Sequence, residues 1–157
     1  MLKDKINDDL KNAMRAKDQL RLSVLRLLKS AITNKELEKQ IKDIGLSDDD
    51  IITVIGTEAK KRRDSIESYA SNNRPEAAQQ EQDELKILME YLPRQLSQEE
   101  LMVIIKEGIA RISLVKGSAM DENDFGLIMK ELTPKVRGLA DGSLVAKLVR
   151  ELINYKL

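Results

Sequence analysis

The segment Tyr91-Leu92-Pro93-Arg94-Gln95-Leu96-Ser97 is the strongest constraint on how this chain folds. Pro93 lacks a backbone N–H and clashes with the preceding helical turn, so a helix that arrives from the N-terminal side has to end here. Ser97 and Glu100 have the spacing of a capping box, and Leu96 and Leu101 have the spacing of a hydrophobic staple. One helical region therefore ends at this joint and a second begins.

Apolar residues before the joint recur at helical spacing in four stretches. The first has a face formed by Leu2, Ile6, Leu10 and Met14. The second, from Leu20 to Ile32, is apolar on more than one face, which is typical of a buried helix, and Gly45 is a suitable stop after it. Ser47 and Pro75 mark the starts of the third and fourth helices, while Asp18 marks the start of the second.

Three shorter helical stretches follow Ser97, and we find no alternating pattern typical of strands. The sequence therefore predicts an all-α protein. We expect an N-terminal four-helix bundle over residues 1–92 and a C-terminal three-helix tail domain over residues 97–157. Pro134 either ends or kinks the sixth helix, and the pattern does not decide between the two.

Composition excludes several kinds of chemistry. The chain has no cysteine and no histidine, so thiolate catalysis and imidazole acid–base catalysis are excluded. No glycine-rich phosphate loop and no metal-ligand spacing is present, so we expect no cofactor and no metal. No segment is apolar enough to span a bilayer and the first residues do not resemble a signal peptide, so we predict a cytoplasmic protein without membrane contact.

Two charged runs have both a functional and a structural interpretation. Asp48-Asp49-Asp50 resembles part of a metal site, but acids are also favoured at a helix N-terminus by its dipole, and we prefer the second interpretation. Lys60-Lys61-Arg62-Arg63 resembles a nucleic-acid patch. Four consecutive residues surround a helix, so we interpret this run as a mostly solvated turn.

The last two helices carry an excess of basic residues. Six follow Phe125, against three acidic residues. Lys147 and Arg150 are three residues apart and share a helix face, so they are suitably placed for an RNA backbone. Our candidate RNA contacts are Lys130, Lys135, Arg137, Lys147 and Arg150. An ordinary polar helix surface is the alternative, and the scarcity of aromatic residues argues against recognition by base stacking.

Several motifs, taken in order, resemble those of the YqeY family, otherwise called the GatB/YqeY domain. They cover nearly the whole chain and are Met14-Arg15-Ala16-Lys17-Asp18, Arg21-Leu22, Leu25-Arg26, Arg62 to Glu67, Tyr91 to Ser97, Asp124 to Met129 and Pro134 to Gly142. One position departs from the family pattern. Leu139 stands where a basic residue is usual in the Gly-(Arg/Lys)-Ala-Asp turn, so a phosphate contact is missing there if that turn binds RNA.

The family is similar to the tail of GatB, a subunit of the glutamine-dependent aspartyl/glutamyl-tRNA amidotransferase. That resemblance implies a helical tail that helps to hold tRNA, without the domains that carry the carbon–nitrogen ligase chemistry. We therefore expect a bacterial, stand-alone module that binds tRNA or associates with tRNA-modifying machinery and is not an enzyme. A protein-interaction adaptor that never binds RNA is the alternative, and an enzyme of unknown type is a third.

Overall fold

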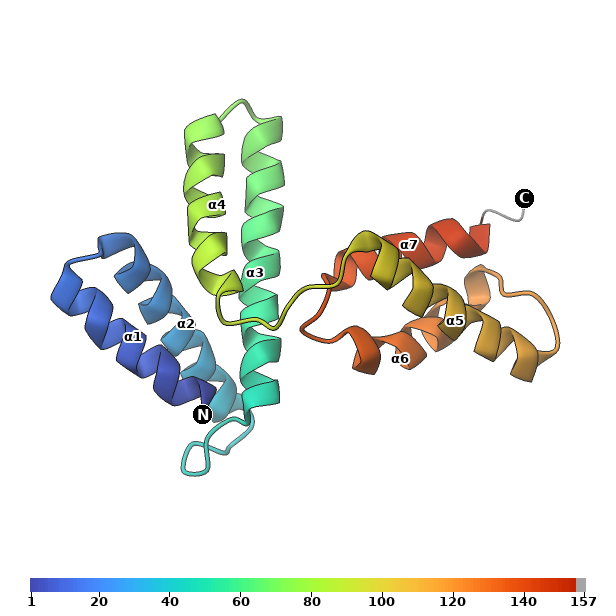
Figure 1. Ribbon diagram of the computed structural model, residues 1–157, viewed down its shortest axis with the longest axis horizontal. Coiled ribbons are helices and arrows are strands. Elements are labelled where there is room, and N and C mark those ends of the chain that lie inside the picture. The colour runs from blue at the N-terminus through green and yellow to red at the C-terminus, as the bar shows by residue number, and fades with distance from the viewer. Residues whose placement is uncertain (155–157) are drawn as a thin grey trace. The chain divides into compact units, whose positions relative to one another are not determined.

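The computed structural model describes residues 1–154, and within that range it contains seven α-helices, one short 3-10 helix and no strands (Figure 1). The predicted all-α class is confirmed. Two compact units divide the chain, Met1–Leu92 and Pro93–Leu157. Each unit has its own buried core, and the two cores share no residue.

The first unit contains four helices: α1 (Leu2–Ala16), α2 (Gln19–Glu38), α3 (Asp48–Ser71) and α4 (Pro75–Met89). Figure 1 shows that α1 and α2 form one antiparallel hairpin, and α3 and α4 form another. The apolar stripes of all four helices meet in a core centred on Leu25, Ile51, Ile55 and Leu88, each at most 1% exposed. Burying such side chains contributes about 1.5–3 kcal/mol each.

Local signals define most helix starts, as predicted. The Asp18 carboxylate accepts a hydrogen bond from the amide of Arg21, and the Ser47 hydroxyl accepts one from the amide of Asp50. Pro75 is the first residue of α4, where its missing N–H costs nothing. These caps satisfy amides that have no partner inside their own helix.

The end of α2 differs from the prediction. The helix stops at Glu38, well before Gly45, because Gln40 adopts a left-handed conformation with φ of 56°. The amides of Gln40 and Ile41 donate to the carbonyls of Leu37 and Glu36, which is the Schellman arrangement. Glycine is the usual residue at this position, so a glutamine there is not a clear stop signal.

Two predictions of burial were also too simple. Met14 is 52% exposed although it follows the apolar period of α1, and Leu27 is 52% exposed although α2 is apolar on more than one side. Conversely, Arg62 belongs to a run interpreted as solvated and is only 9% exposed. Its guanidinium pairs with Glu58 at 3.1 Å and with Glu84 of α4 at 3.4 Å, so it joins α3 to α4.

The joint at Pro93 has the predicted local structure. The helix α4 ends at Met89, and Tyr91 is buried, with its hydroxyl donating to the Asp9 carboxylate at 2.7 Å. Beyond the proline, both hydrogen bonds of the capping box between Ser97 and Glu100 are present. The joint therefore closes the first core on one side and starts the first helix of the second unit on the other.

The second unit contains α5 (Gln98–Lys116), a 3-10 turn η1 (Glu122–Asp124), α6 (Phe125–Val136) and α7 (Gly142–Asn154). Its core is formed by Leu101, Ile105, Ile128, Leu132, Val145 and Val149, each at most 1% exposed. Pro134 lies inside α6, which continues to the buried Val136. The open question about Pro134 is thus answered in part, because the proline does not end the helix.

Candidate nucleic-acid interface

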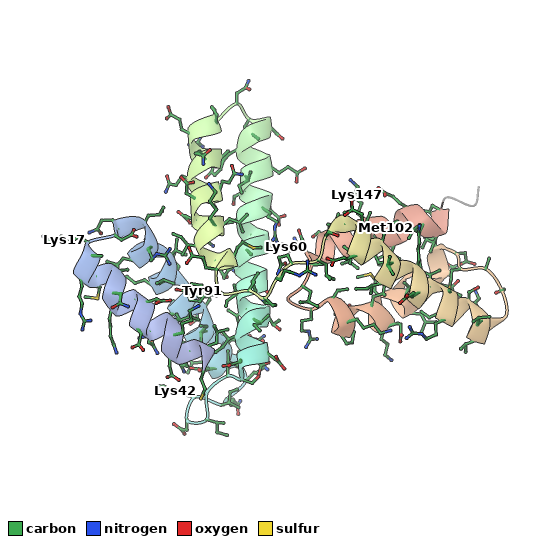
Figure 2. All side chains as sticks on the ribbon, in the orientation of Figure 1. Lys17, Lys42, Lys60, Tyr91, Met102 and Lys147 are labelled. Carbon is green, nitrogen blue, oxygen red and sulfur yellow. The ribbon has the colours of Figure 1, made fainter. Side chains whose placement is uncertain are left out.

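The five candidate RNA contacts lie on the last two helices and at the turn that joins them. Lys130 and Lys135 belong to α6, Arg137 directly follows it, and Lys147 and Arg150 belong to α7. All five are exposed. The side chain of Lys147 points away from its helix, as Figure 2 shows.

Lys147 and Arg150 are the pair that the structure best brings together. They lie three residues apart on the face of α7 opposite its buried residues Val145, Leu148 and Val149. Such spacing places two side chains next to each other on a helix surface. Neither cation has an acidic partner among the described residues, so both charges are available to a phosphate.

Arg150 is also held in place. Its guanidinium carbon lies 4.3 Å from the centre of the Phe125 ring at the start of α6. Stacking on an aromatic face leaves the N–H groups at the guanidinium edge free to donate hydrogen bonds in its plane. Fixing the side chain before binding lowers the entropy lost when it contacts a ligand.

Lys135 is a weaker candidate. Its ammonium group lies 2.6 Å from the Glu131 carboxylate, which also accepts a hydrogen bond from Arg111 at 2.9 Å. The hydrogen bond from Lys135 is the main reason why the pKa of Glu131 lies below its usual value. An RNA phosphate would have to compete with this carboxylate.

Lys130 and Lys135 do not share a face. Five residues on a helix correspond to a rotation of about 140°, so the two side chains point in different directions. Lys130 and the helix-terminal Arg137 have no acidic partner among residues 1–154, but no contact links them to Lys147. The five predicted residues are therefore one well-placed pair and three separate cations.

The turn between α6 and α7 is anchored through its backbone. The side-chain amide of Gln95 donates to the Gly138 carbonyl at 2.8 Å, and the Leu96 amide donates to the Leu139 carbonyl at the same distance. Gly138 has φ of 74°, a conformation in which glycine is not strained. Leu139 is partly buried, and none of these anchoring bonds depends on its side chain. The turn keeps its shape without the basic residue that the family usually has there.

The contact between Phe125 and Arg150 was missed by the sequence reasoning. The two residues are 25 positions apart in the numbering and meet only because α6 packs against α7. No periodic pattern links two residues on different helices, so a single sequence carries no signal for this contact.

The acidic run at the start of α3 has structural partners. Asp50 pairs with Lys39 at 2.6 Å, and Asp48 accepts a hydrogen bond from the Leu2 amide at 2.9 Å. Across residues 1–154, no group of three acidic side chains is placed to hold a metal ion. Within the same range, no helix is long and apolar enough to cross a membrane.

Comparison with known proteins identifies a family. A family model described as "Yqey-like protein" matches residues 3–153. Similar curated proteins come from fungi and carry the name "Altered inheritance of mitochondria protein 41, mitochondrial". The relative from Lachancea thermotolerans is 40% identical over 88 residues, which is 55% of this chain and 46% of the relative. The relative from Pyrenophora tritici-repentis is 27% identical over 156 residues, 97% of this chain and 81% of the relative.

A third relative, from Kluyveromyces lactis, is 37% identical over 86 residues, 55% of this chain and 45% of the relative. The chain thus spans about half the length of several of the curated relatives that it matches. Two predictions were wrong in the light of these names. We expected a bacterial and cytoplasmic protein, whereas the relatives are fungal and are named as mitochondrial.

Proposed function

Since the chain belongs to the YqeY family, we propose that it is a non-catalytic helical module that binds tRNA or associates with tRNA-modifying machinery. The proposal includes a specific arrangement of the fold. A four-helix bundle is followed by a three-helix domain that corresponds to the tail of GatB. The fungal relatives are named as mitochondrial, and the same proposal includes a mitochondrial location for this chain.

The observation that carries the proposal is the pair of cations on α7. Lys147 and Arg150 are exposed, adjacent and without acidic partners among the described residues, and Arg150 is oriented by Phe125. Two cations at this spacing fit successive phosphates of an RNA strand. Binding of this type is electrostatic and does not depend on base identity.

The test is binding of the full chain to bulk tRNA over a range of salt concentrations. Each phosphate contact contributes a slope of about −0.9 to a plot of log K against log salt, so K147Q/R150Q should reduce the magnitude of the slope by about 2. R111Q/K116Q is the matched control. It removes the same charge from the same unit, but from cations that already pair with Glu131 and Asp124.

Two results would contradict the proposal. One is the absence of tRNA binding even at low salt. The other is an affinity that falls equally in K147Q/R150Q and in the control, because net charge alone would then explain the loss.

A second candidate function is a protein-interaction adaptor that does not bind RNA. Its support is apolar surface in the second unit, where Leu114 and Val115 at the end of α5 are 83% and 87% exposed. A depression of about 260 Å³ lies between α5 and α7, lined largely by apolar residues that include Ile109 and Leu152. A pull-down from mitochondrial extract with and without nuclease separates the two candidates, since an adaptor retains its partner after RNA is digested.

A further inference from the structure

The hairpin of α1 and α2 carries an excess of positive charge. Residues 2–38, which span the two helices, contain nine basic and six acidic side chains, a net charge of +3. Residues 93–154, by comparison, contain nine of each sign. A net positive charge is thus present in a part of the chain that the proposed tail interface does not use.

The six acids of this hairpin are already occupied. Glu36 pairs with Lys3, and Glu38 pairs with Lys35. Asp4 lies near the terminal amino group and Asp8 pairs with Lys11. Asp9 accepts a hydrogen bond from the Tyr91 hydroxyl, and Asp18 caps α2. They are therefore poorly placed to neutralise the remaining cations.

Four exposed cations of the hairpin have no acidic partner among residues 1–154: Arg15, Lys17, Arg26 and Lys29. Figure 2 shows Lys17 at the turn between α1 and α2. Arg26 and Lys29 lie three residues apart on α2, and both side chains are exposed. They are neighbours on one helix surface in the same way as Lys147 and Arg150 on α7.

Arg26 and Lys29 also border a depression in the first unit. It has a volume of about 560 Å³ and is lined by Leu10 of α1 and by Arg26, Lys29, Ser30, Thr33 and Asn34 of α2. Two cations, two hydroxyls and an amide line one concave surface, and such groups contact phosphate oxygens in protein–nucleic acid complexes. The surface is open, which suits a polymer backbone better than a small enclosed anion.

We propose that this depression is a second site for the phosphodiester backbone of RNA, with Arg26 and Lys29 as its charged contacts. The inference rests on the proposed function, because it assigns a second surface to the same ligand. An anionic membrane is the less favoured ligand. Apart from the half-buried Leu10, the lining of the depression is polar, so the depression itself offers no protruding apolar side chain for insertion into a membrane.

The experiment uses the full chain, bulk tRNA and the double variant R26Q/K29Q. Both residues are exposed and glutamine is a good helix former, so the variant should fold. We expect the salt slope to lose about 2 in magnitude and the affinity at 0.1 M salt to fall on the order of 30-fold. The matched control is K11Q/K35Q, which removes two cations of the same hairpin that already pair with Asp8 and Glu38.

The outcomes separate this inference from the proposed function. If R26Q/K29Q lowers tRNA affinity and K11Q/K35Q does not, the site on the hairpin is supported. If R26Q/K29Q binds like the unmodified chain while K147Q/R150Q binds more weakly, the inference is wrong and the proposed interface on α7 stands. If only R26Q/K29Q binds more weakly, the hairpin site stands and the interface on α7 fails.

A vesicle arm tests the alternative ligand. The chain is mixed with vesicles that contain phosphatidylglycerol, using R26Q/K29Q and M14Q, since Met14 is the exposed apolar residue four positions after Leu10. Two results together would overturn the inference in favour of a membrane surface. Vesicle binding would have to require Arg26, Lys29 and Met14, and tRNA binding would have to require none of them.

Discussion

Among residues 1–154, three residues other than glycine adopt left-handed backbone conformations at helix ends. Lys17, Gln40 and Asn73 have φ of 55°, 56° and 53°, and each ends a helix through a Schellman pair of hydrogen bonds. A side chain with a Cβ atom costs about 1–2 kcal/mol in this conformation, although asparagine tolerates it better. At these three helix ends, glycine would adopt the left-handed backbone conformation with less strain.

We expect Gln40→Gly to stabilise the first unit. Relief of backbone strain should exceed the added entropy of the unfolded chain, for a net gain of about 0.5–1 kcal/mol. Chemical denaturation monitored by circular dichroism measures the change. Asn73→Gly is the comparison and should gain less, so an equal gain at both positions would show that strain at Gln40 is not the cause.

Glu36 makes stability depend on pH. Its carboxylate is 3% exposed and accepts hydrogen bonds from the Lys3 ammonium group and the Leu46 amide. The bond from Lys3 is the main reason why the pKa of Glu36 is lower than its ordinary value of 4.5. A lowered pKa means that the ionised form stabilises the fold above pH 4.5 and that this contribution is lost as pH falls through the folded-state pKa.

Glu36→Gln should therefore cost about 1–2 kcal/mol at pH 7, and the difference from the unmodified chain should shrink as pH falls below 4. Unfolding in denaturant at several pH values measures both effects. Glu38→Gln is the control, because Glu38 is an exposed partner of Lys35 and should change stability by less than about 0.5 kcal/mol. A cost for Glu36→Gln that is the same at pH 7 and pH 3 would exclude the ionised carboxylate as its source.

The helices α2, α3 and α5 begin where short sequence motifs specify a cap. Asp18, Ser47 and Ser97 each accept the expected amide, and these bonds span only three residues. Signals of this range are visible in a single sequence. The burial of Arg62 was not predictable in this way, because its partner Glu84 lies on another helix.

The candidate interface likewise combines a feature that is local in the sequence with features that depend on tertiary packing. The shared face of Lys147 and Arg150 follows from helical spacing and was predicted. The stacking of Arg150 on Phe125 and the pairing of Lys135 with a carboxylate shared with Arg111 depend on how three helices pack. Tertiary packing, which one sequence does not reveal, decides which of the predicted cations are available.

Two glycines inside helices should respond to alanine in opposite directions. A Cβ atom at Gly56 in α3 would meet no atom within 4 Å, whereas one at Gly108 in α5 would lie 2.7 Å from the buried Leu132 side chain. Gly56→Ala should stabilise its unit by about 0.5–1 kcal/mol through helix propensity. Gly108→Ala gains the same propensity but overpacks the contact between α5 and α6, so we expect a net loss of about 1 kcal/mol.

Thermal and denaturant unfolding of the two variants provides the check, since each serves as the control for the other. Stabilisation by both substitutions would show that Leu132 moves aside at little cost. Destabilisation by both would show that Gly56 is needed for a reason other than space.

At the scale of the whole molecule, two units with separate cores lie in consecutive stretches of the sequence. That they are independent domains is still a prediction. We expect fragments 1–92 and 93–157 to be helical and to unfold cooperatively on their own, because no core residue of one unit belongs to the core of the other. Circular dichroism melts of both fragments test this, and a fragment without a cooperative transition would contradict it.

Charge is also divided along the chain. The α1–α2 hairpin is positive, residues 39–92 carry eight basic and twelve acidic side chains, and residues 93–154 are balanced. An overall neutral protein therefore has no bulk attraction for a polyanion, and any affinity for RNA has to come from local surfaces. This is why the proposed tests replace cations in pairs and compare them with cations that acids already neutralise.

The hydrogen bond between Tyr91 and Asp9 has a consequence for how the protein is made. Tyr91 is buried in the first core and lies 82 residues after its partner, so the ribosome has to translate nearly the whole first unit before that core can close. We expect the α1–α2 hairpin to remain partly folded until Tyr91 leaves the ribosomal exit tunnel. The second unit is still incomplete and largely inside the tunnel at that moment, so it cannot compete for the same apolar surface. The order of translation thus keeps the two cores from mixing.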